Sequence, residues 1–338
     1  MRGPDVFVIG GGPAGLAAAI AAARRGMRVV VADGHRPPID KACGEGLMPD
    51  SRRAALRLGI EFPVSQGFEF RGIRFHDGAH SVESEFPEGC GLGLRRTALH
   101  RVLMENAEAA GVEMRWGAPI NRLDEIQARW IIGADGVSSQ VRSWAGLEAK
   151  TWNSRRFAYR MHLEAAPWSP FMEIYWGPGC QMYITPVSAR EVCVAVISES
   201  PRLRVREAME RFFPQLRERL GNAEITSRER GAATATVRLR AVTRGNIALI
   251  GDASGSVDAI TGEGNCLAFR QAERLAEALC RGDLSIYGKA HPRLAARHHL
   301  MARAMLFMGR VAAARRAAMS AMAREPRIFR ALLGVHVA

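Results

Sequence analysis

The chain has 338 residues, of which 48% are hydrophobic and 7% are aromatic, and it contains 34 glycines. This size and composition are typical of one large soluble α/β domain or of two joined ones. The formal net charge is +13, and all but three of the 47 basic residues are arginine. This bias towards arginine is typical of a GC-rich genome. The basic residues do not alternate with aromatics as a base-stacking surface requires, so nucleic acid is not an expected partner.

The six cysteines are scattered, without a CxxC pair or a Cys/His cluster. This spacing argues against a disulfide framework and against a zinc site, and it favours a reducing cytoplasm. No metal centre is expected. The uncharged stretch 6–23 is as apolar as a signal peptide or a membrane span, but four glycines and a proline interrupt it. We therefore expect a strand, a turn and a helix there.

The apolar pattern predicts a βαβ unit at the start of the chain, with parallel buried strands at Asp5–Ile9 and Met27–Ala32 around a helix at Pro13–Arg25. Further along, a helix and three more apolar strands are expected, at Arg96–Ala110, Val112–Trp116, Ala128–Ala134 and Asn246–Ile250. Period-two alternation instead predicts antiparallel sheet at Phe68–Phe86 and over about Arg156–Ser198.

These elements predict an α/β protein, α+β overall, whose nucleotide-binding domain is discontinuous. Residues 1–60, 91–150 and 240–290 are expected to form that domain. Residues 61–90 and 151–239 would form a second, mostly antiparallel layer, and residues 291–338 a helical tail.

A GxGxxG motif lies between the first strand and the first helix. Gly10 allows a tight turn, Gly12 lets a pyrophosphate approach the backbone, and Gly15 lets the helix pack on the strand. Pro13 and Ala14 complete the helix N-terminus, where free N–H groups favour phosphate. Asp33 ends the second strand, where an acid hydrogen-bonds ribose. The motif predicts a dinucleotide but does not separate FAD from NAD.

Two later segments separate them. Residues 131–142 have the GADGxxSxxR pattern, which includes Asp135, and residues 247–253 end in Gly251-Asp252-Ala253, where the acid would bind a ribityl chain. Beyond them, Gly262, Gly264 and Asn265 open a helix whose N-terminus would stabilise negative charge on a reduced flavin. Together with the GxGxxG motif, these two segments make three in the expected order. They predict non-covalently bound FAD in a Rossmann domain of the glutathione-reductase type.

With these motifs the chain resembles the flavoprotein monooxygenase superfamily typified by para-hydroxybenzoate hydroxylase, and more closely its geranylgeranyl-reductase-like branch. The resemblance includes the loop Cys43-Gly44-Glu45-Gly46 and the sequence Arg96-Thr97-Ala98-Leu99, whose arginine would contact FAD. The segment Gly251-Asp252-Ala253-Ser254-Gly255 departs from the Gly-Asp-Ala-Ala-His of aromatic hydroxylases, and the Trp-x-Trp-x-Ile-Pro signature of flavin halogenases is missing. These departures argue against phenol hydroxylation specifically.

The resemblance implies an FAD-dependent oxidoreductase driven by NAD(P)H, which would visit the site transiently as the reductant. The first expectation is a monooxygenase of a hydrophobic polyketide-, quinone- or isoprenoid-like substrate. The alternative is a reductase of carbon–carbon double bonds, and a third is a non-catalytic flavin-binding protein. The sequence names neither the substrate nor the oligomeric state.

Candidate catalytic and substrate residues follow from the same resemblance. Cys43 would lie near the flavin ring, either tuning its chemistry or simply packing in a glycine-rich turn, and Glu45 is the acid/base candidate. A lipophilic substrate would lie between the flavin and the antiparallel layer, beside Tyr175, Met182, Tyr183 and Pro186.

The tail carries ten basic residues against one acid, Glu325, over residues 289–338. Its apolar residues recur at helical spacing from Leu294 through Met301, Met305 and Met308. The first expectation is a helix packed on the FAD-binding domain. The alternative is a basic amphipathic surface for an anionic membrane or an acidic carrier protein, which would make this cytoplasmic protein membrane-peripheral.

Overall fold

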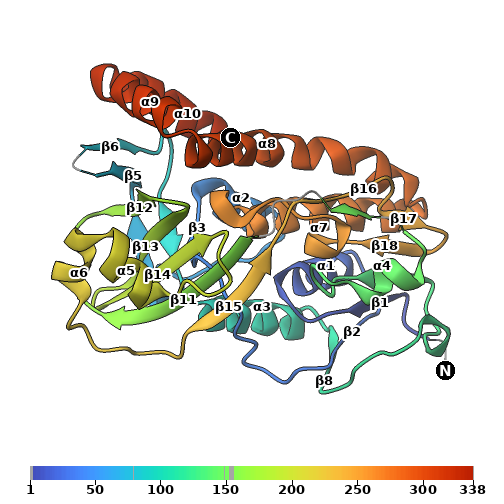
Figure 1. Cartoon of the computed structure of the whole chain (residues 1–338). Coiled ribbons are helices and arrows are strands. Elements are labelled where there is room, and N and C mark those ends of the chain that lie inside the picture. Colours follow the sequence, from blue (N-terminus) through green and yellow to red (C-terminus); the bar gives the residue numbers. More distant parts are fainter. Residues whose placement is uncertain (1–2, 79, 148, 152–155, 338) are drawn as a thin grey trace.

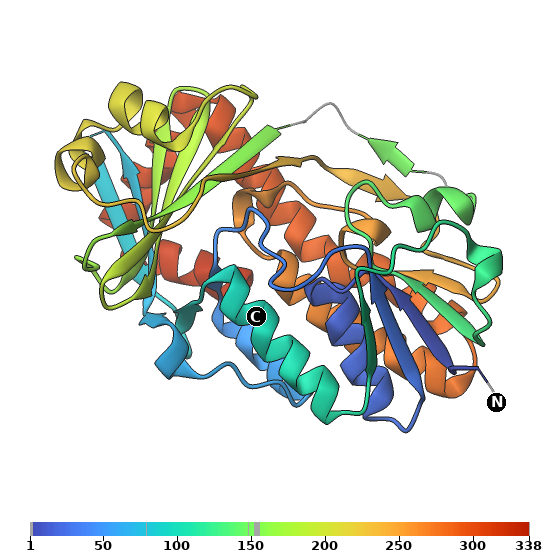
Figure 2. The same ribbon diagram turned by 90° about the horizontal axis from the view of Figure 1, so that it is seen from below.

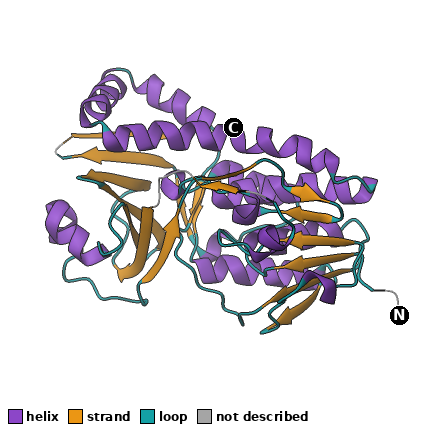
Figure 3. Cartoon of the chain, turned by 45° about the vertical axis from the view of Figure 1, so that its right-hand side comes forward, coloured by secondary structure: helices purple, strands orange, loops and turns teal. Residues whose placement is uncertain are grey.

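Two sheets lie side by side in the computed structural model, and a set of C-terminal helices runs along both of them (Figures 1 and 2). The structure describes residues 3–337 except 79, 148 and 152–155. Helices pack on both sheets, and the loops between the sheets converge where the two layers meet (Figure 3).

The first sheet has six strands in the order β17-β18-β9-β1-β2-β8, and all are parallel except β17. Their bounds are β1 Val6–Ile9, β2 Val29–Asp33, β8 Glu113–Trp116, β9 Trp130–Gly133, β17 Thr243–Arg244 and β18 Ile247–Leu249. The central strand β1 is buried along its whole length, as expected for a parallel strand covered on both faces. These strands fall within the ranges expected for the FAD-binding domain, and the division into domains stays a prediction.

Helices cover both faces of this sheet. Three of them form one layer around a common apolar core: α1 Pro13–Ala23, α3 Arg96–Ala109 and α7 Gly264–Arg281. Alanine fills much of α1, and eight of its residues are buried, which allows α1 to approach β1 and α7 closely. The short helix α4, Gln140–Trp144, packs with the other face.

The second sheet has seven strands in the order β15-β11-β14-β13-β12-β5-β6. Only the β12–β5 pair is parallel. The bounds are β5 Gly72–Asp77, β6 His80–Glu85, β11 Arg156–Glu164, β12 Phe171–Gly177, β13 Cys180–Ser188, β14 Glu191–Ser198 and β15 Arg230–Thr234. One face packs on α5 Val205–Phe212 and α6 Pro214–Leu220. The other faces the loops of the first domain and the C-terminal helices, and we call it the inner face.

Small elements connect the two layers. Strands β3 Gly46–Leu47, β7 Gly91–Gly93 and β4 Phe68–Phe70 form a three-stranded sheet next to β13. The helix α2, Pro49–Arg57, follows β3 and packs on α7. Strands β10 Ala149–Thr151 and β16 Val237–Leu239 form a separate antiparallel pair. The described part of the chain also contains short 3₁₀ turns at η1 Val64–Gln66, η2 Leu123–Glu125, η3 Gly251–Ser254 and η4 Ala259–Thr261.

The C-terminal segment folds into α8 Ser285–Arg310, α9 Ala312–Arg324 and α10 Pro326–His336. As expected, α8 packs on the first domain, against α7 and η4. Beyond that expectation, α9 and α10 pack on β6 of the second sheet, so the segment spans both layers (Figure 1). Within the described residues, no helix is both long and apolar enough to cross a membrane.

Candidate flavin site

The glycine-rich turn has the geometry that a pyrophosphate requires. A Cβ on Gly10 would lie 2.4 Å from the carbonyl oxygen of Ala134, and one on Gly15 would lie 1.9 Å from that of Gly10. Both positions therefore exclude any side chain. Gly12 differs, because a Cβ there would meet nothing within 4 Å. Gly12 caps α1, whose first turn contains Pro13 and no acidic residue. The turn thus leaves free space in front of a helix N-terminus, which suits a phosphate.

Asp33 lies beside this turn. Its carboxylate accepts hydrogen bonds from the backbone N–H groups of Gly11, at 2.7 Å, and His35, at 2.8 Å. Asp33 therefore holds the phosphate turn in shape, a role that sequence reasoning did not foresee. Its expected contact with ribose stays a prediction.

Two further side chains support Gly11, and sequence reasoning missed both. His100 Nε2 lies 2.8 Å from the Gly11 carbonyl oxygen, and burial lowers the pKa of His100. The ring of Trp116 lies where a Cβ of Gly11 would stand, 2.2 Å from it. Nothing in the local sequence marks these residues, since they come from α3 and β8.

Asp135 uses one carboxylate oxygen for structure and leaves the other open. Oδ2 accepts hydrogen bonds from the N–H groups of Gln140, at 2.7 Å, and Val141, at 3.1 Å, at the start of α4. Oδ1 is buried without a hydrogen-bond partner among the described residues. A buried unpaired oxygen costs free energy unless a ligand or water satisfies it, so Asp135 keeps one acceptor available.

The Gly-Asp segment lies against the phosphate turn. Gly251 has a φ of 60°, and a Cβ there would lie 2.6 Å from the Cβ of Ala14. The next residue, Asp252, is exposed. Arg142 of the GADGxxSxxR segment donates a hydrogen bond to the carbonyl oxygen of Ala253, at 3.2 Å. The three sequence segments therefore meet at one edge of the first sheet.

The loop before α7 completes this edge. Gly262 has a φ of 69°, and a Cβ on Gly262 or Gly264 would meet nothing within 4 Å. Gly264 begins α7, and Asn265 is half-buried in its first turn. Open space in front of both glycines and a free helix N-terminus fit the pyrimidine end of a flavin ring. The residues present thus fit the part of FAD from the pyrophosphate to the flavin ring, between the phosphate turn and this loop.

Between the two glycines, Glu263 turns away from the open space. One carboxylate oxygen lies 3.0 Å from His298 Nδ1 on α8 and 3.4 Å from His336 Nδ1 on α10. All three residues are buried. The C-terminal helices are therefore anchored directly behind the expected flavin ring.

The Cys43–Gly46 loop forms the opposite wall. Glu45 has a φ of 59°, the only positive value for a non-glycine residue in the described part of the chain. Thr185 of β13 donates a hydrogen bond to the carbonyl oxygen of Gly44, at 2.8 Å. The Cys43 sulfur accepts one from the Glu45 N–H, at 3.4 Å, and burial raises the pKa of the Cys43 thiol. Burial therefore favours the neutral thiol of Cys43 over its thiolate.

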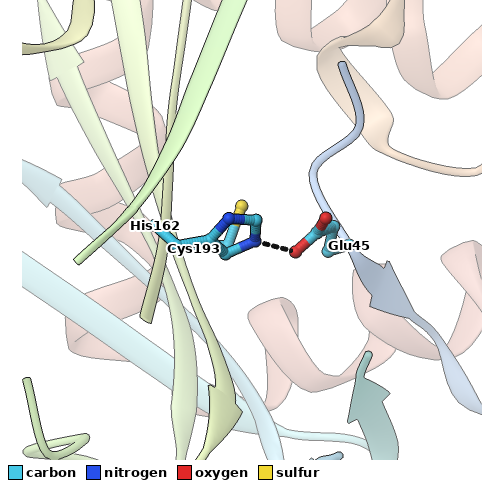
Figure 4. Close-up of side chains that lie close together, drawn as sticks. All are labelled: Glu45, His162 and Cys193. Atoms are coloured by element: carbon cyan, nitrogen blue, oxygen red, sulfur yellow. Dashed lines mark hydrogen bonds and ion pairs between the residues drawn. The ribbon is translucent and has the colours of Figure 1, made fainter. Parts of the chain in front are cut away.

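The unusual backbone of Glu45 directs its side chain inward. Oε1 accepts a hydrogen bond from the Arg96 N–H, at 2.9 Å, and Oε2 lies 2.6 Å from Nε2 of His162 (Figure 4). Arg160 lies 3.5 Å from Oε1. The Glu45 side chain has no exposed surface. The acid/base candidate is thus paired with a histidine and an arginine of β11. Sequence reasoning missed both, because they lie more than 110 positions away in the chain.

Arg96 is buried as well, and burial lowers its pKa. Its Nη1 has no hydrogen-bond partner among the described residues. This open donor beside Cys43 and Glu45 is suited to a ligand oxygen, consistent with the FAD contact that the sequence predicts.

The four expected substrate residues divide between the two faces of the second sheet. Tyr183 points to the inner face and donates a hydrogen bond to the Ile260 carbonyl oxygen, at 2.8 Å. Pro186 is buried against Gly93. Met182 and Tyr175 pack on the outer face, and Tyr175 lines an open hollow of about 1030 Å³ beside α6. The geometry does not bring these two toward the flavin loops, because neighbouring residues on a strand face opposite sides.

The inner face is also more polar than the sequence suggested. The register of β11 places Arg156, Arg160 and His162 on it, all buried. Arg156 pairs with Asp258 at 3.1 Å. A lipophilic substrate on this face would therefore meet charged groups along β11, with Ala158 between Arg156 and Arg160.

One group of potential metal ligands occurs among the described residues. One ligand atom each of Glu45, His162 and Cys193 lies within 4.8 Å of the others. The Arg160 guanidinium beside Glu45 would repel a cation, and both carboxylate oxygens already have partners. The arrangement is better suited to hydrogen bonding than to a metal ion.

The fold and these converging segments define a flavoprotein with a Rossmann domain of the glutathione-reductase type. The chain belongs to the FAD binding domain family, which it matches over residues 4–304. It is an FAD-dependent oxidoreductase, and NAD(P)H is a plausible reductant for this family.

The chain is similar in sequence to reductases and in fold to a brominase. The menaquinone reductase of Mycolicibacterium smegmatis is 27% identical over 340 residues, which cover 87% of this chain and 81% of that protein. The digeranylgeranylglycerophospholipid reductase of Methanosarcina acetivorans is 27% identical over 325 residues, which cover 83% of this chain and 77% of that protein. A solved structure of the flavin-dependent brominase Bmp2 superposes with a TM-score of 0.85 at 17% identity, covering 99% of this chain and 94% of that one.

Proposed function

We propose that this protein reduces a carbon–carbon double bond in a lipophilic, isoprenoid- or quinone-like substrate, using FAD that NAD(P)H has reduced. The observation that carries the proposal is the Glu45 carboxylate, buried beside the expected flavin ring and 2.6 Å from His162. Double-bond reduction needs a proton as well as a hydride, and this pair is suited to handle the proton.

The sequence alone placed monooxygenation first and double-bond reduction second. We reverse that order because the sequence relatives described above are reductases of menaquinone and of a digeranylgeranyl lipid. The Cys43–Gly46 loop adds support, since it is the feature by which the chain resembles the geranylgeranyl-reductase-like branch. The likeness to the brominase structure supports the fold only, because the identity is 17%.

Each group at the site has a physical role in this scheme. FAD, when bound, supplies the hydride. Gly12 and the N-terminus of α1 would hold its phosphates, and Gly264 at the start of α7 would stabilise negative charge on its ring. Arg96 would bind a ligand oxygen with its open Nη1. The inner face of the second sheet, with Tyr183 and Ala195, would hold the apolar part of the substrate and exclude water.

Monooxygenation is the competing function, because it uses the same flavin site. Product analysis separates the two. In the presence of NAD(P)H, a reductase gives a product heavier than the substrate by two hydrogens, with or without oxygen. A monooxygenase gives a product that contains one atom of molecular oxygen, and none forms when oxygen is removed. A panel of polyprenylated quinones and isoprenoid lipids is the appropriate set of substrates.

The protein needs access to its lipophilic substrate. We propose that it gains this access by docking its C-terminal helices on an anionic bilayer. Leu300 and Phe307 on α8 are 62% and 57% exposed, at a spacing of two helical turns. On α10, Ile328, Leu332 and Val335 are 41%, 45% and 52% exposed, at the spacing i, i+4, i+7. Large apolar side chains exposed on one side of a helix are typical of an interfacial surface.

The positive charge of the C-terminal segment indicates which kind of partner this surface binds. Residues 289–338 carry ten basic residues against one acid. A second copy of the chain would bring like charges together, whereas anionic lipid headgroups neutralise them. An acidic carrier protein would match the charge, but the exposed apolar side chains on two helices favour a bilayer.

A further inference from the structure

The loop before α7 carries a buried acidic side chain. Glu263 lies between Gly262 and Gly264 as the N-cap residue of α7, and its side chain is 1% exposed. Neither of its carboxylate oxygens has a hydrogen-bond partner among the described residues. Burying an ionised carboxylate is costly unless positive charge compensates it. The groups around Glu263 therefore decide how much negative charge this loop presents.

Three other helices bring charged or titratable groups to Glu263. On α8, His298 Nδ1 lies 3.0 Å from Oε2, and Arg297 Nη2 lies 3.6 Å from Oε1. On α10, His336 Nδ1 lies 3.4 Å from Oε2. On α2, Asp50 adds a second buried carboxylate, 2.7 Å from Nη2 of Arg297. The cluster thus combines two carboxylates, one guanidinium and two histidines.

With both carboxylates ionised, charge balance requires a proton on one of the histidines. Arg297 is permanently charged, and it lies nearer to Asp50 than to Glu263. Compensation of Glu263 is therefore left to the histidines. Burial lowers the pKa of His336, which favours its neutral form. His298 is the closer of the two, and a carboxylate at 3.0 Å stabilises a proton on its ring.

The place of this carboxylate matters for the flavin. The N-terminus of α7 carries the positive end of the helix dipole, and the open space at Gly262 and Gly264 fits the pyrimidine end of the flavin ring. Reduction of a flavin puts negative charge on that end. A carboxylate without compensation at Glu263 would repel this charge and oppose the helix dipole, whereas a neutral pair with His298 would not.

We propose that His298 is a positioning residue of the flavin site, whose charge neutralises Glu263 so that the N-terminus of α7 stabilises the reduced flavin. His298 acts through Glu263 and does not itself contact the flavin. His336 lies against the same oxygen and helps to hold the carboxylate in place. The inference goes beyond the proposed function, because it concerns the reduction potential of the bound flavin whatever the substrate.

The test measures the reduction potential of FAD bound to the full chain, by equilibrium reduction together with a reference dye. His298→Gln keeps a polar side chain but removes the charge. We expect its potential to fall by about 30 mV, which for two electrons is a tenfold loss in the ratio of reduced to oxidised flavin. The double variant with Glu263→Gln should regain the wild-type potential, because the uncompensated charge is gone. His299→Gln, on the next residue of α8, is the matched control and should leave the potential unchanged.

Two results would overturn the proposal. One is a potential in His298→Gln equal to that of wild type. The other is a lowered potential that persists in the double variant, because packing and not charge would then be responsible.

A second readout needs neither turnover nor FAD binding by a variant. Nitrogen NMR of labelled histidine should show His298 protonated on both ring nitrogens in the wild type at neutral pH, and singly protonated in Glu263→Gln. A neutral His298 in the wild type would contradict the proposal. Neither measurement uses a substrate, so a failure to reduce double bonds would count against the proposed function and not against the role of His298.

Discussion

The carboxylate of Asp33 accepts a hydrogen bond from the backbone N–H of Gly11 at 2.7 Å, which ties the end of β2 to the phosphate turn after β1. The variant Asp33→Ala removes this bond and the expected ribose contact together. Charge-assisted hydrogen bonds contribute about 1.5–3 kcal/mol, so the FAD dissociation constant should rise by about one to two orders of magnitude. Flavin fluorescence titration measures it. An unchanged dissociation constant would show that Asp33 serves the fold alone.

Substitutions of two glycines in the phosphate turn should impair the protein in two different ways. Gly12→Val places a side chain in open space, so the apoprotein should fold with an unchanged melting temperature and lose FAD. Gly15→Val forces a Cβ to within 1.9 Å of the Gly10 carbonyl oxygen and should destabilise the apoprotein itself. Thermal unfolding with and without FAD separates them. Full FAD occupancy in Gly12→Val would contradict the assignment of the phosphate site.

Much of this site was predictable from the sequence, and the reason is local. The glycine motif, Asp135 and the Gly251-Asp252 pair each act within a few residues of a strand end, so spacing alone locates them. The residues that support them were not predictable. His100, Trp116, Arg160 and His162 reach the site from other elements through tertiary packing, and no short-range pattern encodes that. The split of Tyr175 and Tyr183 between two faces depended on strand register, which a residue-by-residue reading left open.

Glu173 lies outside the flavin site, and we expect it to make the stability of the folded protein depend on pH. Burial alone would raise its pKa, but hydrogen bonds from His76, Tyr175, Ser169 and Trp168 outweigh burial and lower the pKa to about 2. A carboxyl whose pKa is lower in the folded state stabilises the fold above its unfolded value of 4.5, and this stabilisation is lost as the pH falls toward 2.

The variant Glu173→Gln should therefore be less stable than wild type at neutral pH, and the difference should shrink between pH 4.5 and pH 2. Urea unfolding at a series of pH values measures it, with the exposed Glu218→Gln as the control. A constant difference at all pH values would mean that the loss comes from packing and not from charge.

The bilayer proposal predicts selective binding to anionic vesicles. The wild-type protein should sediment with vesicles containing phosphatidylglycerol and not with pure phosphatidylcholine, and added salt should weaken binding. Replacing Leu332 and Val335 by serine should release the protein from the anionic vesicles. The control is Leu56→Ser, because Leu56 is 55% exposed on α2, outside the docking surface. Equal binding of both vesicle types, or none, would contradict the proposal.

The most direct test of the central claim is an anaerobic single turnover. The bound FAD is reduced, excess reductant is removed, and a polyprenylated quinone or isoprenoid lipid is added in the absence of oxygen while the yellow absorbance of oxidised flavin is recorded. Double-bond reduction predicts that the absorbance returns with substrate alone and that one substrate is reduced for each flavin reoxidised. If the flavin stays reduced until oxygen is admitted, and the product then contains an oxygen atom, the protein is a monooxygenase and not a reductase of double bonds.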